Sequence, residues 1–307
     1  MDIAIIGAGA MGCLFAARLH DAGAAVTLLD IDPLTLHHIS LHGVRLHSAG
    51  STGPVHSHHP VRALRAEQAA GPFELIVIFT KSFSTGAALA SVSHLLGPDT
   101  WVLTLQNGLG HVDTIAAQVA ASRILVGVTD IPADLTDVGT VHCTDAGGIR
   151  LWSHAGTHQP MLTLVTELFN RGGLPCIADP QVQVAIWHKA AFNAALNALC
   201  TVLREPVAGI GDNEDGRWLV RAVIEESAAV ACAQGVAFDA AQVLQTIDQV
   251  YAEQGQHRPS MLQDRLAGRA TEIENINGAI VHSARRQGVA TPVLETLYRL
   301  VRIGEPA

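Results

Sequence analysis

The stretch DIAIIGAGAMGCLFAARLHDAGAAVTLLD, residues 2–30, decides the fold of the N-terminal half of the chain. Residues 2–6 are an apolar run that predicts a short buried strand, and a helix-forming run follows the glycines to about His20. Gly23 ends that helix, and AVTLLD at 25–30 predicts a second strand. A strand, a crossover helix and another strand are typical of a βαβ unit in a parallel sheet.

The glycines of this stretch have the spacing GxGxxG, directly after a strand and at the start of a helix. Gly7 allows the tight turn, Gly9 lets the backbone approach a pyrophosphate, and Gly12 lets helix and strand pack closely. The helix N-terminus favours negative charge. We therefore predict a dinucleotide-binding loop that includes Ala10 and Met11. The alternative is a βα turn that is merely rich in glycine, which the strand, helix and second strand in register disfavour.

Asp30 ends the second strand, where an acidic side chain accepts hydrogen bonds from the adenosine ribose and repels a 2′-phosphate. It follows Gly12 by 18 residues, and no arginine occurs in residues 24–44. Asp30 could instead cap a helix that begins at Pro33, a role that Asp32 fills as easily. We expect NAD or NADP as the cofactor, with NAD favoured by Asp30.

The remaining pattern predicts an α/β domain followed by an all-helical domain. Further strands are expected at 74–81, 100–108, 123–130, 139–145, 148–152 and 174–179, with helices from about 112 and over 160–171. Residues 41–62 alternate around the turn-like AGSTGP and predict an antiparallel hairpin insert. After residue 180 only helix-period apolar residues occur. We expect a Rossmann-type domain over 1–179 and a helical domain for substrate and dimerisation over 180–307.

Composition excludes several classes of protein. The chain has 307 residues, 49% of them hydrophobic and 15% charged, with a formal charge of −9. A globular protein fits these values, whereas a nucleic-acid binder or an anionic-membrane binder needs a basic field. Five scattered cysteines without a CxxC pair favour a reduced, cytoplasmic protein. The apolar N-terminus lacks the basic start of a signal peptide, and no uncharged run is long enough to span a membrane.

Seven histidines gather at the predicted hairpin: His37, His38, His42, His47, His56, His58 and His59. No HExxH pattern or Cys/His ligand set accompanies them, and exposed hairpins often carry polar residues. We therefore expect no metal site.

Two polar residues follow predicted buried strands. Lys81 ends ELIVIFTK, and Asn107 follows WVLTLQ. Ligands of open α/β sheets bind at the carboxyl ends of the strands, so both are candidate cofactor contacts. The lysine could also simply extend to water, and Asn-Gly could simply form a turn.

A second chemical signal lies in WHKAAFNAALNALCTVL, residues 187–203. Lys189, Asn193 and Asn197 are four residues apart and form one polar stripe on an otherwise apolar helix. A solvated stripe would more usually carry Glu, Arg and Gln. Burial lowers the pKa of a lysine, which suits proton transfer near neutral pH, and amides can bond a substrate oxygen without adding charge.

At this point the sequence resembles the ketopantoate reductase family, the 2-dehydropantoate 2-reductases. The resemblance rests on GAGAMG, TKSFST, TLQNGLG, WHKAAFNAALNAL and SMLQDRLAGRATEIENINGAI, in family order and at family spacing. It implies an N-terminal Rossmann domain, a C-terminal helical domain of the 6-phosphogluconate-dehydrogenase type, an active site in the cleft between them, and a step of pantothenate biosynthesis.

The resemblance also implies residue roles. Lys189 matches the family's catalytic lysine, which protonates the C2 oxygen as hydride arrives, with Asn193 beside it and Asn197 at the substrate. Asn107 and Lys81 match residues near the nicotinamide and the cofactor, and Asn107 is also expected to contact the substrate.

The same comparison assigns Ser260 to the substrate carboxylate and Glu272 to its terminal hydroxyl. From the residues alone, RPSMLQD predicts a helix with Pro259 in its first turn. Thr271 and Glu274 could form a capping box, in which case Glu272 would be only a first-turn acid. Asp264, in SMLQD, could be an exposed acid or a structural partner.

Two features depart from the family pattern. LLDIDP has no basic residue after the second strand, although the family typically prefers NADP, and His257 and Arg258 stand where a smaller polar residue is common. The family includes NAD-dependent reductases of other 2-keto acids, such as the D-mandelate dehydrogenase type.

We therefore predict an oxidoreductase that reduces a small 2-keto acid, similar to ketopantoate, to the 2-hydroxy acid. The alternatives are an NAD-dependent D-2-hydroxyacid dehydrogenase with a bulkier substrate and a non-catalytic dinucleotide-binding regulator. The presence together of Lys189, Asn193, Ser260 and Glu272 argues against the regulator. We expect no nucleic-acid or membrane partner, and the apolar helical domain is compatible with a homodimer.

Overall fold

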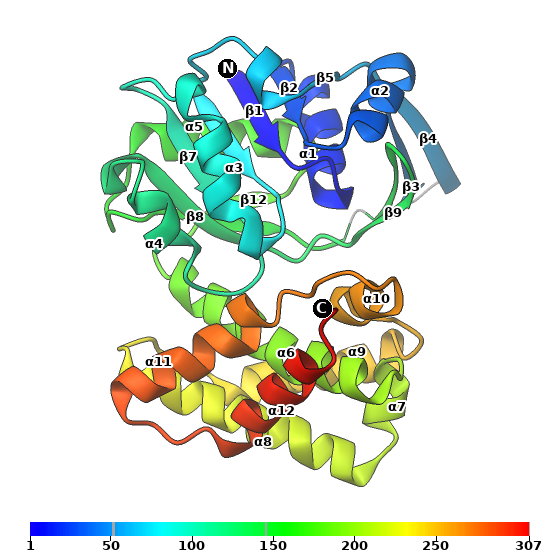
Figure 1. The fold of residues 1–307 in the computed structure, drawn as a ribbon, viewed down its shortest axis with the longest axis vertical. Helices are drawn as coiled ribbons and strands as arrows, with labels where there is room; N and C mark the ends of the chain where they lie inside the picture. Colours follow the sequence, from blue (N-terminus) through cyan, green and yellow to red (C-terminus); the bar gives the residue numbers. More distant parts are fainter. Residues whose placement is uncertain (51–52, 145, 307) are drawn as a thin grey trace. The chain divides into compact units, whose positions relative to one another are not determined.

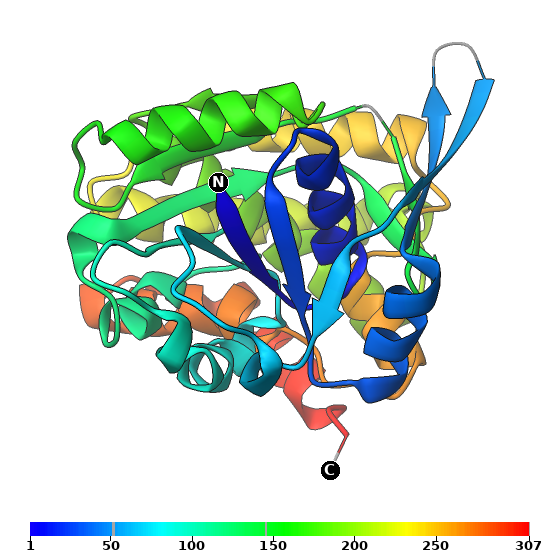
Figure 2. The same ribbon diagram turned by 90° about the horizontal axis from the view of Figure 1, so that it is seen from above.

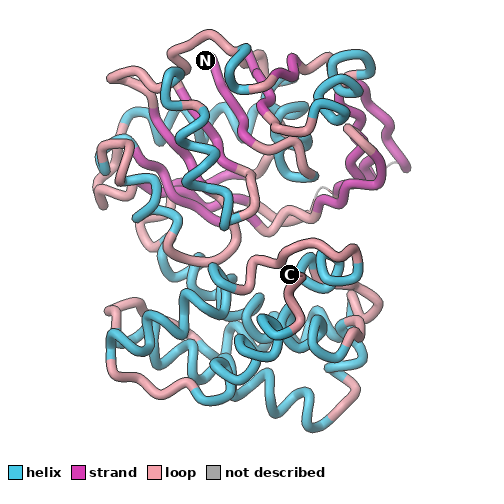
Figure 3. Tube along the Cα trace, viewed as in Figure 1, coloured by secondary structure: helices cyan, strands magenta, loops and turns pink. Residues whose placement is uncertain are grey.

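The computed structural model describes residues 1–50, 53–144 and 146–306. The chain divides into two compact units: unit 1 is Met1–Gln106 with His111–Val182, and unit 2 is Asn107–Gly110 with Gln183–Ala307. Figure 3 shows that, in the described part of the chain, strands occur only in unit 1 and unit 2 is helical. The predicted α/β Rossmann-type domain with an all-helical second domain is confirmed as the fold class.

Unit 1 is built on an eight-stranded sheet (Figure 1). Its order is β12 (Cys176–Ala178), β11 (Ile149–Ser153), β8 (Ile124–Thr129), β7 (Trp101–Thr104), β6 (Leu75–Ile78), β1 (Asp2–Ile6), β2 (Ala25–Leu29) and β5 (Arg62–Leu64). The six strands from β8 to β5 run parallel, and only β11 is antiparallel to its neighbour β8. This is the doubly wound order: successive strands are added in one direction from β1 to β2 and β5, and in the other direction from β6 to β8. Ligands of such sheets bind at the carboxyl ends of the strands where the order reverses, here β1 and β6.

Helices cover both faces of this sheet (Figure 2). One face carries α1 (Ala10–Asp21) and α5 (Pro160–Arg171), and the other carries α3 (Thr85–Ser91) and α4 (His111–Ala116). Phe15 of α1 packs against Phe79 and Phe169 with ring centroids 4.7 and 5.4 Å apart. Both faces are buried, which explains why β1 and β6 read as continuous apolar runs rather than alternating ones. Short 3₁₀ turns complete unit 1: η1 (Ala66–Gln68), η2 (Ser82–Ser84), η3 (Ser93–Leu95) and η4 (Ala121–Arg123).

The predicted hairpin forms from β3 (Val44–Gly50) and β4 (Gly53–His59), which pair antiparallel. Figure 2 shows it extending from the large sheet. The predicted turn includes residues 51–52, which lie outside the described residues. The predicted bounds of this hairpin insert, 41–62, were wrong at both ends. Residues 41–42 belong to α2 (Pro33–His42), and β5 leaves the hairpin to pair with β2.

The hairpin also continues into a second sheet of order β4-β3-β10-β9. β3 pairs parallel with β10 (Thr140–Cys143), which pairs antiparallel with β9 (Ala133–Asp137). β9 was not predicted, because Leu135 is its only large apolar residue and is 46% exposed, so the strand lacks an apolar alternation.

Unit 2 contains seven α-helices among its described residues. They are α6 (Val182–Leu203, whose first residue belongs to unit 1), α7 (Val207–Gly211), α8 (Glu214–Ala233), α9 (Ala240–Glu253), α10 (Ser260–Leu266), α11 (Ala279–Gln287) and α12 (Pro292–Ile303). A π-helical turn, η5 (Glu274–Gly278), precedes α11. The core is formed mainly by α6, α8, α11 and α12, with residues such as Leu196, Ile224 and Ile280 fully buried. Within the residues the structure describes, no helix is both long and apolar enough to cross a membrane.

Candidate active site

The glycine loop between β1 and α1 has the geometry of a phosphate-binding turn. Gly7 has φ +106°, and a Cβ there would lie 2.9 Å from the Phe79 carbonyl carbon. A Cβ on Gly12 would lie 1.8 Å from the Gly7 oxygen, so the helix packs directly on the turn. A Cβ on Gly9, in contrast, would meet no atom within 4 Å. Gly7 and Gly12 are therefore required by the protein itself, whereas Gly9 leaves open space in front of the N-terminus of α1, where a pyrophosphate fits.

Asp30 is held at the end of β2 by backbone donors. Its Oδ2 accepts from the Ala8 N–H at 2.6 Å, and its Oδ1 accepts from the N–H groups of Ile31 and Asp32 at 2.7 and 3.0 Å. A carboxylate has about four acceptor positions, so about one remains for a ligand. Asp32, not Asp30, caps α2, because its carboxylate accepts from the N–H groups of Leu34 and Thr35. The capping alternative for Asp30 was wrong.

A basic residue beside Asp30 was missed in the sequence. Arg65 follows β5, donates from Nη1 to the Ile31 carbonyl at 3.1 Å, and donates from Nε to Glu67 at 2.6 Å. Arg65 lies 34 positions from Ile31 in the chain. Only the pairing of β5 with β2 brings the two together, so no local pattern could have revealed it.

The loops after β6 and β7 are tied together by Gln106. Its Nε2 donates to the Thr80 carbonyl at 2.8 Å and to the Thr85 hydroxyl at 2.9 Å. Lys81 follows Thr80 directly, at the carboxyl end of β6 as predicted, and leads into η2. The glutamine of QNG therefore holds the lysine loop in place, a role that the sequence did not indicate.

Asn107, the next residue, belongs to unit 2 rather than to the sheet unit. In that unit the Leu109 N–H donates to the Asn275 carbonyl at 2.8 Å. The short segment Asn107–Gly110 is thus grouped with the helices, although the sequence places it inside the Rossmann domain.

The polar stripe on α6 is not solvated. Asn193 is 7% and Asn197 4% exposed, and Lys189 is half-buried. Among the described residues, neither amide side chain is hydrogen-bonded to another residue. Both amides therefore keep donors and acceptors that are available to a ligand on one helix face.

Lysine is scarce in this protein. The sequence contains two lysines, Lys81 and Lys189, and both are among the predicted site residues. All other basic side chains of the Lys/Arg type are arginines, which do not release a proton near neutral pH. This count was a signal available from the sequence that supports a chemical role for both lysines.

The motif SMLQD begins α10 at Ser260, with Pro259 at the N-cap rather than in the first turn. Ser260 is exposed, whereas Asp264 is 3% exposed and accepts from Arg269 Nε at 3.0 Å. Asp264 is therefore a structural partner. Glu272 is 8% exposed and lies just before the π-helical turn.

The capping-box alternative for Glu272 was wrong. Thr271 donates through its N–H and its hydroxyl to Glu305, at 3.0 and 2.7 Å. Glu274 accepts from the Tyr298 hydroxyl at 2.7 Å and pairs with Arg302 at 3.0 Å. Neither side chain makes a reciprocal cap, which leaves a buried carboxylate at Glu272 without a helix-start explanation.

The histidines of the hairpin contact one another and the protein. His47 and His56 stack edge to face at 4.4 Å, and buried His59 has ring nitrogens 2.8 Å from Asp21 Oδ1 and from Ser57 Oγ. In residues 1–50, 53–144 and 146–306, no three His, Cys, Asp or Glu side chains are arranged to hold a metal ion.

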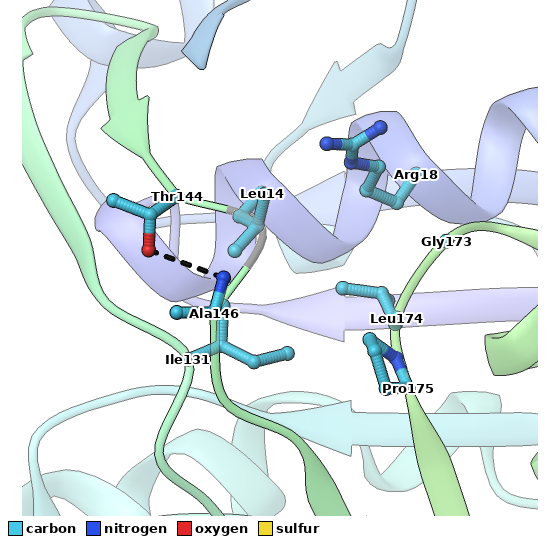
Figure 4. Close-up of a pocket in the computed structure, with 8 residues that line it drawn as sticks. All are labelled: Leu14, Arg18, Ile131, Thr144, Ala146, Gly173, Leu174 and Pro175. Atoms are coloured by element: carbon cyan, nitrogen blue, oxygen red, sulfur yellow. Dashed lines mark hydrogen bonds between the residues drawn. The ribbon is translucent and has the colours of Figure 1, made fainter. Parts of the chain in front are cut away.

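A small pocket in unit 1 lies apart from the predicted site residues (Figure 4). It encloses about 10 Å³, the space of about one water molecule. Its lining residues are Leu14, Arg18, Ile131, Thr144, Ala146, Gly173, Leu174 and Pro175. It is too small for an organic ligand and does not compete with the glycine loop as a binding site.

The doubly wound sheet, the glycine loop and the helical unit define an oxidoreductase of the Rossmann type. Residues 3–156 match the model of the ketopantoate reductase PanE/ApbA family, and residues 181–305 match the model of its C-terminal domain. The chain belongs to the ketopantoate reductase family, as the sequence motifs indicated.

Individual relatives match over almost their whole length. The chain is 33% identical to 2-dehydropantoate 2-reductase of Lactococcus lactis subsp. lactis (strain IL1403), over 99% of this chain and 98% of that protein. The structure of D-mandelate dehydrogenase with NADH and anilino(oxo)acetate superposes with a TM-score of 0.93 at 30% identity, covering 99% and 98% of the two chains. The 2-dehydropantoate 2-reductase of Geobacter metallireducens GS-15 superposes with a TM-score of 0.91 at 31% identity, covering 99% of each chain.

Proposed function

We propose that this protein reduces a small 2-keto acid to the corresponding 2-hydroxy acid with a reduced nicotinamide dinucleotide, and that the substrate is ketopantoate. The observation that carries the proposal is the stripe of Lys189, Asn193 and Asn197, which puts one lysine and two buried, unpartnered amides on the same helix face. A family of ketopantoate reductases supplies the reaction class.

The cofactor is held by residues 1–179 in this proposal. Gly7, Gly9, Ala10, Met11 and Gly12 receive the pyrophosphate at the start of α1, where open space at Gly9 supports the fit. Lys81 and Asn107 are the proposed contacts nearer the nicotinamide, because they follow the two strands beyond the reversal point of the sheet. When bound, the reduced nicotinamide supplies the hydride that the C2 carbonyl of the substrate accepts.

Lys189 provides the proton in this proposal. As the carbonyl carbon gains hydride, negative charge grows on the C2 oxygen, and the ammonium transfers a proton to that oxygen. Asn193, one turn further along α6, donates a hydrogen bond to the same oxygen and stabilises the developing charge without competing for the proton. The product leaves with its new C–H and O–H bonds, and Lys189 regains its proton from solvent.

The remaining proposed site residues orient the substrate. Ser260 binds the carboxylate, Asn197 and Asn107 add amide contacts, and Glu272 accepts a hydrogen bond from the terminal hydroxyl. This last role rests on the match of Glu272 to the family motif in TEIENING.

NAD is the proposed physiological cofactor. The negative charge of Asp30 at the end of β2 disfavours the 2′-phosphate of NADP. The D-mandelate dehydrogenase structures contain NADH, which is compatible with this preference in a similar fold. Arg65 is the residue that would favour NADP, because its guanidinium is bonded to the Ile31 carbonyl beside Asp30 and could bind a 2′-phosphate. Arg45, another basic residue that follows β2 in the chain, lies in β3 of the four-stranded sheet.

A second candidate function is an NAD-dependent D-2-hydroxyacid dehydrogenase with a bulkier substrate. The high TM-score with D-mandelate dehydrogenase favours it. His257 and Arg258, in place of a smaller polar residue, also fit a different substrate side chain. Both functions use the same acid and differ in whether Glu272 binds a substrate hydroxyl.

A panel of 2-keto acids separates the candidates. Initial rates of NADH and NADPH oxidation are measured with ketopantoate, its analogue with methyl in place of hydroxymethyl, and phenylglyoxylate. The proposal expects the highest kcat/KM with ketopantoate. A preference for phenylglyoxylate supports the dehydrogenase, and inactivity with every keto acid supports a regulator.

The two lysines allow a second test. Reductive methylation, read by peptide mass spectrometry, reports on Lys81 and Lys189 separately. Cofactor alone should protect Lys81, and Lys189 should gain protection when ketopantoate is added with NAD⁺. Equal labelling of Lys189 with and without substrate would contradict its place in the site.

We infer further that the protein forms a homodimer through unit 2. Several large apolar side chains there are about half exposed or more, which a partner copy would cover: Leu203, Trp218, Leu266, Leu300 and Ile303. Light scattering after gel filtration should give twice the chain mass, and Trp218→Glu should shift the protein toward a monomer.

A further inference from the structure

Three parts of unit 2 that carry proposed site residues meet at the π-helical turn η5. They are the segment with Glu272, the segment Asn107–Gly110 and the helix α6. The Gly278 N–H donates to the Ile273 carbonyl at 2.9 Å, a five-residue step that defines the turn. Such turns are rare, and they occur frequently at functional sites. Glu272 lies two residues before the first residue of this turn, so the direction of its side chain depends on how the turn is fixed.

On one side, η5 holds the segment that contains Asn107. The Asn275 carbonyl accepts from the Leu109 N–H at 2.8 Å. Gly108 has φ +91°, and a Cβ there would lie 2.2 Å from that same carbonyl oxygen. The segment therefore lies in direct backbone contact with η5, and only glycine fits at this point.

On another side, η5 holds α6. Asn277 is fully buried, and its Nδ2 donates to the Ala194 carbonyl at 2.9 Å. Ala194 directly follows Asn193 and lies within the turn of α6 that separates it from Asn197. Since Asn277 and Ala194 are 83 positions apart, this bond fixes the two elements in register.

The same asparagine carries an unsatisfied group. In the part of the chain that the structure describes, Asn277 Oδ1 is buried and has no hydrogen-bond partner. Burying an unpaired amide oxygen is destabilising. An apolar residue would avoid that cost, so stability alone does not explain an asparagine here.

The outer side of η5 is braced against α12. Glu274 accepts from the Tyr298 hydroxyl at 2.7 Å, and a Cβ on Gly278 would lie 2.9 Å from a ring carbon of Tyr298. Thr271, just before Glu272, is bonded to Glu305. The turn is therefore held from both sides and cannot move without breaking several contacts.

We propose that Asn277 is a positioning residue that sets Glu272 and Asn107 in register with Lys189 and Asn193 by tying η5 to the Ala194 carbonyl. This inference rests on the proposed function for the roles of those four residues. It predicts that loss of the Asn277 amide lowers the preference for ketopantoate over its methyl analogue and leaves cofactor binding nearly unchanged.

The test compares Asn277→Ala with Ser227→Ala. Ser227 is the matched control, because it is also fully buried and also donates to a helix carbonyl, that of Val223 at 2.7 Å, within α8. For both variants the melting temperature, the Kd for NADH and the kcat/KM for ketopantoate and its methyl analogue are measured. Asn277→Asp, which keeps the side-chain size, is the second variant if Asn277→Ala does not fold.

The ratio of the two kcat/KM values is the decisive readout. Asn277→Ala should lower this ratio by about tenfold or more, as expected when reacting groups lose their alignment, with the Kd for NADH within about twofold. Ser227→Ala should keep the wild-type ratio despite a lower melting temperature. An unchanged ratio in Asn277→Ala, with activity lost only in proportion to stability, would overturn the proposal.

Hydrogen exchange separates this inference from the proposed function. In Asn277→Ala, but not in Ser227→Ala, amide exchange should speed up in Asn107–Gly110 and around residues 193–198. If the wild type shows no preference for the hydroxyl substrate, the proposed function fails, while this exchange pattern still supports the register role. Unchanged exchange in both segments would overturn that role whatever the substrate.

Discussion

The carboxylate of Asp30 accepts a 2.6 Å hydrogen bond from the backbone N–H of Ala8, so the acidic end of β2 is fastened to the glycine loop after β1. Asp30, which is expected to determine the preference between NAD and NADP, therefore also holds the glycine loop that is expected to bind the cofactor's pyrophosphate. A substitution at Asp30 therefore acts on both, and its controls have to separate the two effects.

Asp30→Ser should lower kcat/KM with NADH and raise it with NADPH. The substitution removes an acceptor for the ribose diol and a charge that repels the 2′-phosphate. We expect the ratio of kcat/KM for NADH to that for NADPH to fall by about tenfold or more, corresponding to at least 1.4 kcal/mol. Asp32→Asn is the control, because it removes the same charge two residues away and keeps a good helix cap. A wild-type preference for NADPH would contradict the role of Asp30.

Arg65 should account for whatever NADPH activity Asp30→Ser gains. Its guanidinium is already beside Ile31, where it forms an ion pair with Glu67. We expect the double variant Asp30→Ser/Arg65→Gln to lose most of the gain with NADPH and to change little with NADH, since arginine binds phosphate through paired donors. Equal NADPH activity in the single and double variants would remove Arg65 from phosphate binding.

Lys189→Ala should lower kcat by about two to four orders of magnitude, the range for loss of a positioned general acid, with NADH binding nearly unchanged. Lys189→Arg is the matched variant. It keeps the positive charge but does not release a proton near neutral pH, so it should not restore kcat. Recovery of activity in Lys189→Arg would show that charge alone is needed, and a near-wild-type kcat in Lys189→Ala would exclude the residue from the chemistry.

Glu272→Ala should cost about 1.5–3 kcal/mol in kcat/KM with ketopantoate, the value of a hydrogen bond to a charged group. With the methyl analogue the change should be small, because that substrate has no hydroxyl to bind. Glu274→Gln, two residues away and bonded to Tyr298, is the control for effects on the turn itself. A similar loss with both substrates would contradict the hydroxyl-binding role.

The cysteines should differ sharply in reactivity. Burial raises the pKa of Cys13, Cys176 and Cys200 to about 12, with the nearby Asp30 carboxylate adding to the effect at Cys13. A raised thiol pKa keeps these groups protonated at pH 8, and the thiolate is the reactive form. Of the five free cysteines only Cys232 is exposed. We expect one rapidly titrated thiol in the native protein and five after unfolding. More than one in the native protein would contradict the burial of the other four.

Local patterns were sufficient for much of the architecture. The βαβ start was predicted within a residue at most boundaries, and α5 was predicted over its observed span, 160–171. These elements are decided by hydrophobic period, glycine and proline within one short window. β9 and the true end of the hairpin were not predicted from the sequence. β9 is stabilised by pairing with β10 and carries almost no apolar pattern of its own.

What the sequence by itself determined was therefore the doubly wound first domain, the glycine loop, the helical second domain and the stripe of Lys189, Asn193 and Asn197. Each of these features is decided by residues that are close in the sequence, within a single strand or about two turns of one helix. The tertiary structure alone decided that Arg65 reaches Ile31, that Asn107 belongs with the helices, and that Asn277 ties η5 to α6. The first contact joins residues 34 positions apart and the third joins residues 83 positions apart, while the second is made through Leu109 and the still more distant Asn275. Their partners are chosen by sheet pairing and by close backbone packing, which no short window of sequence records.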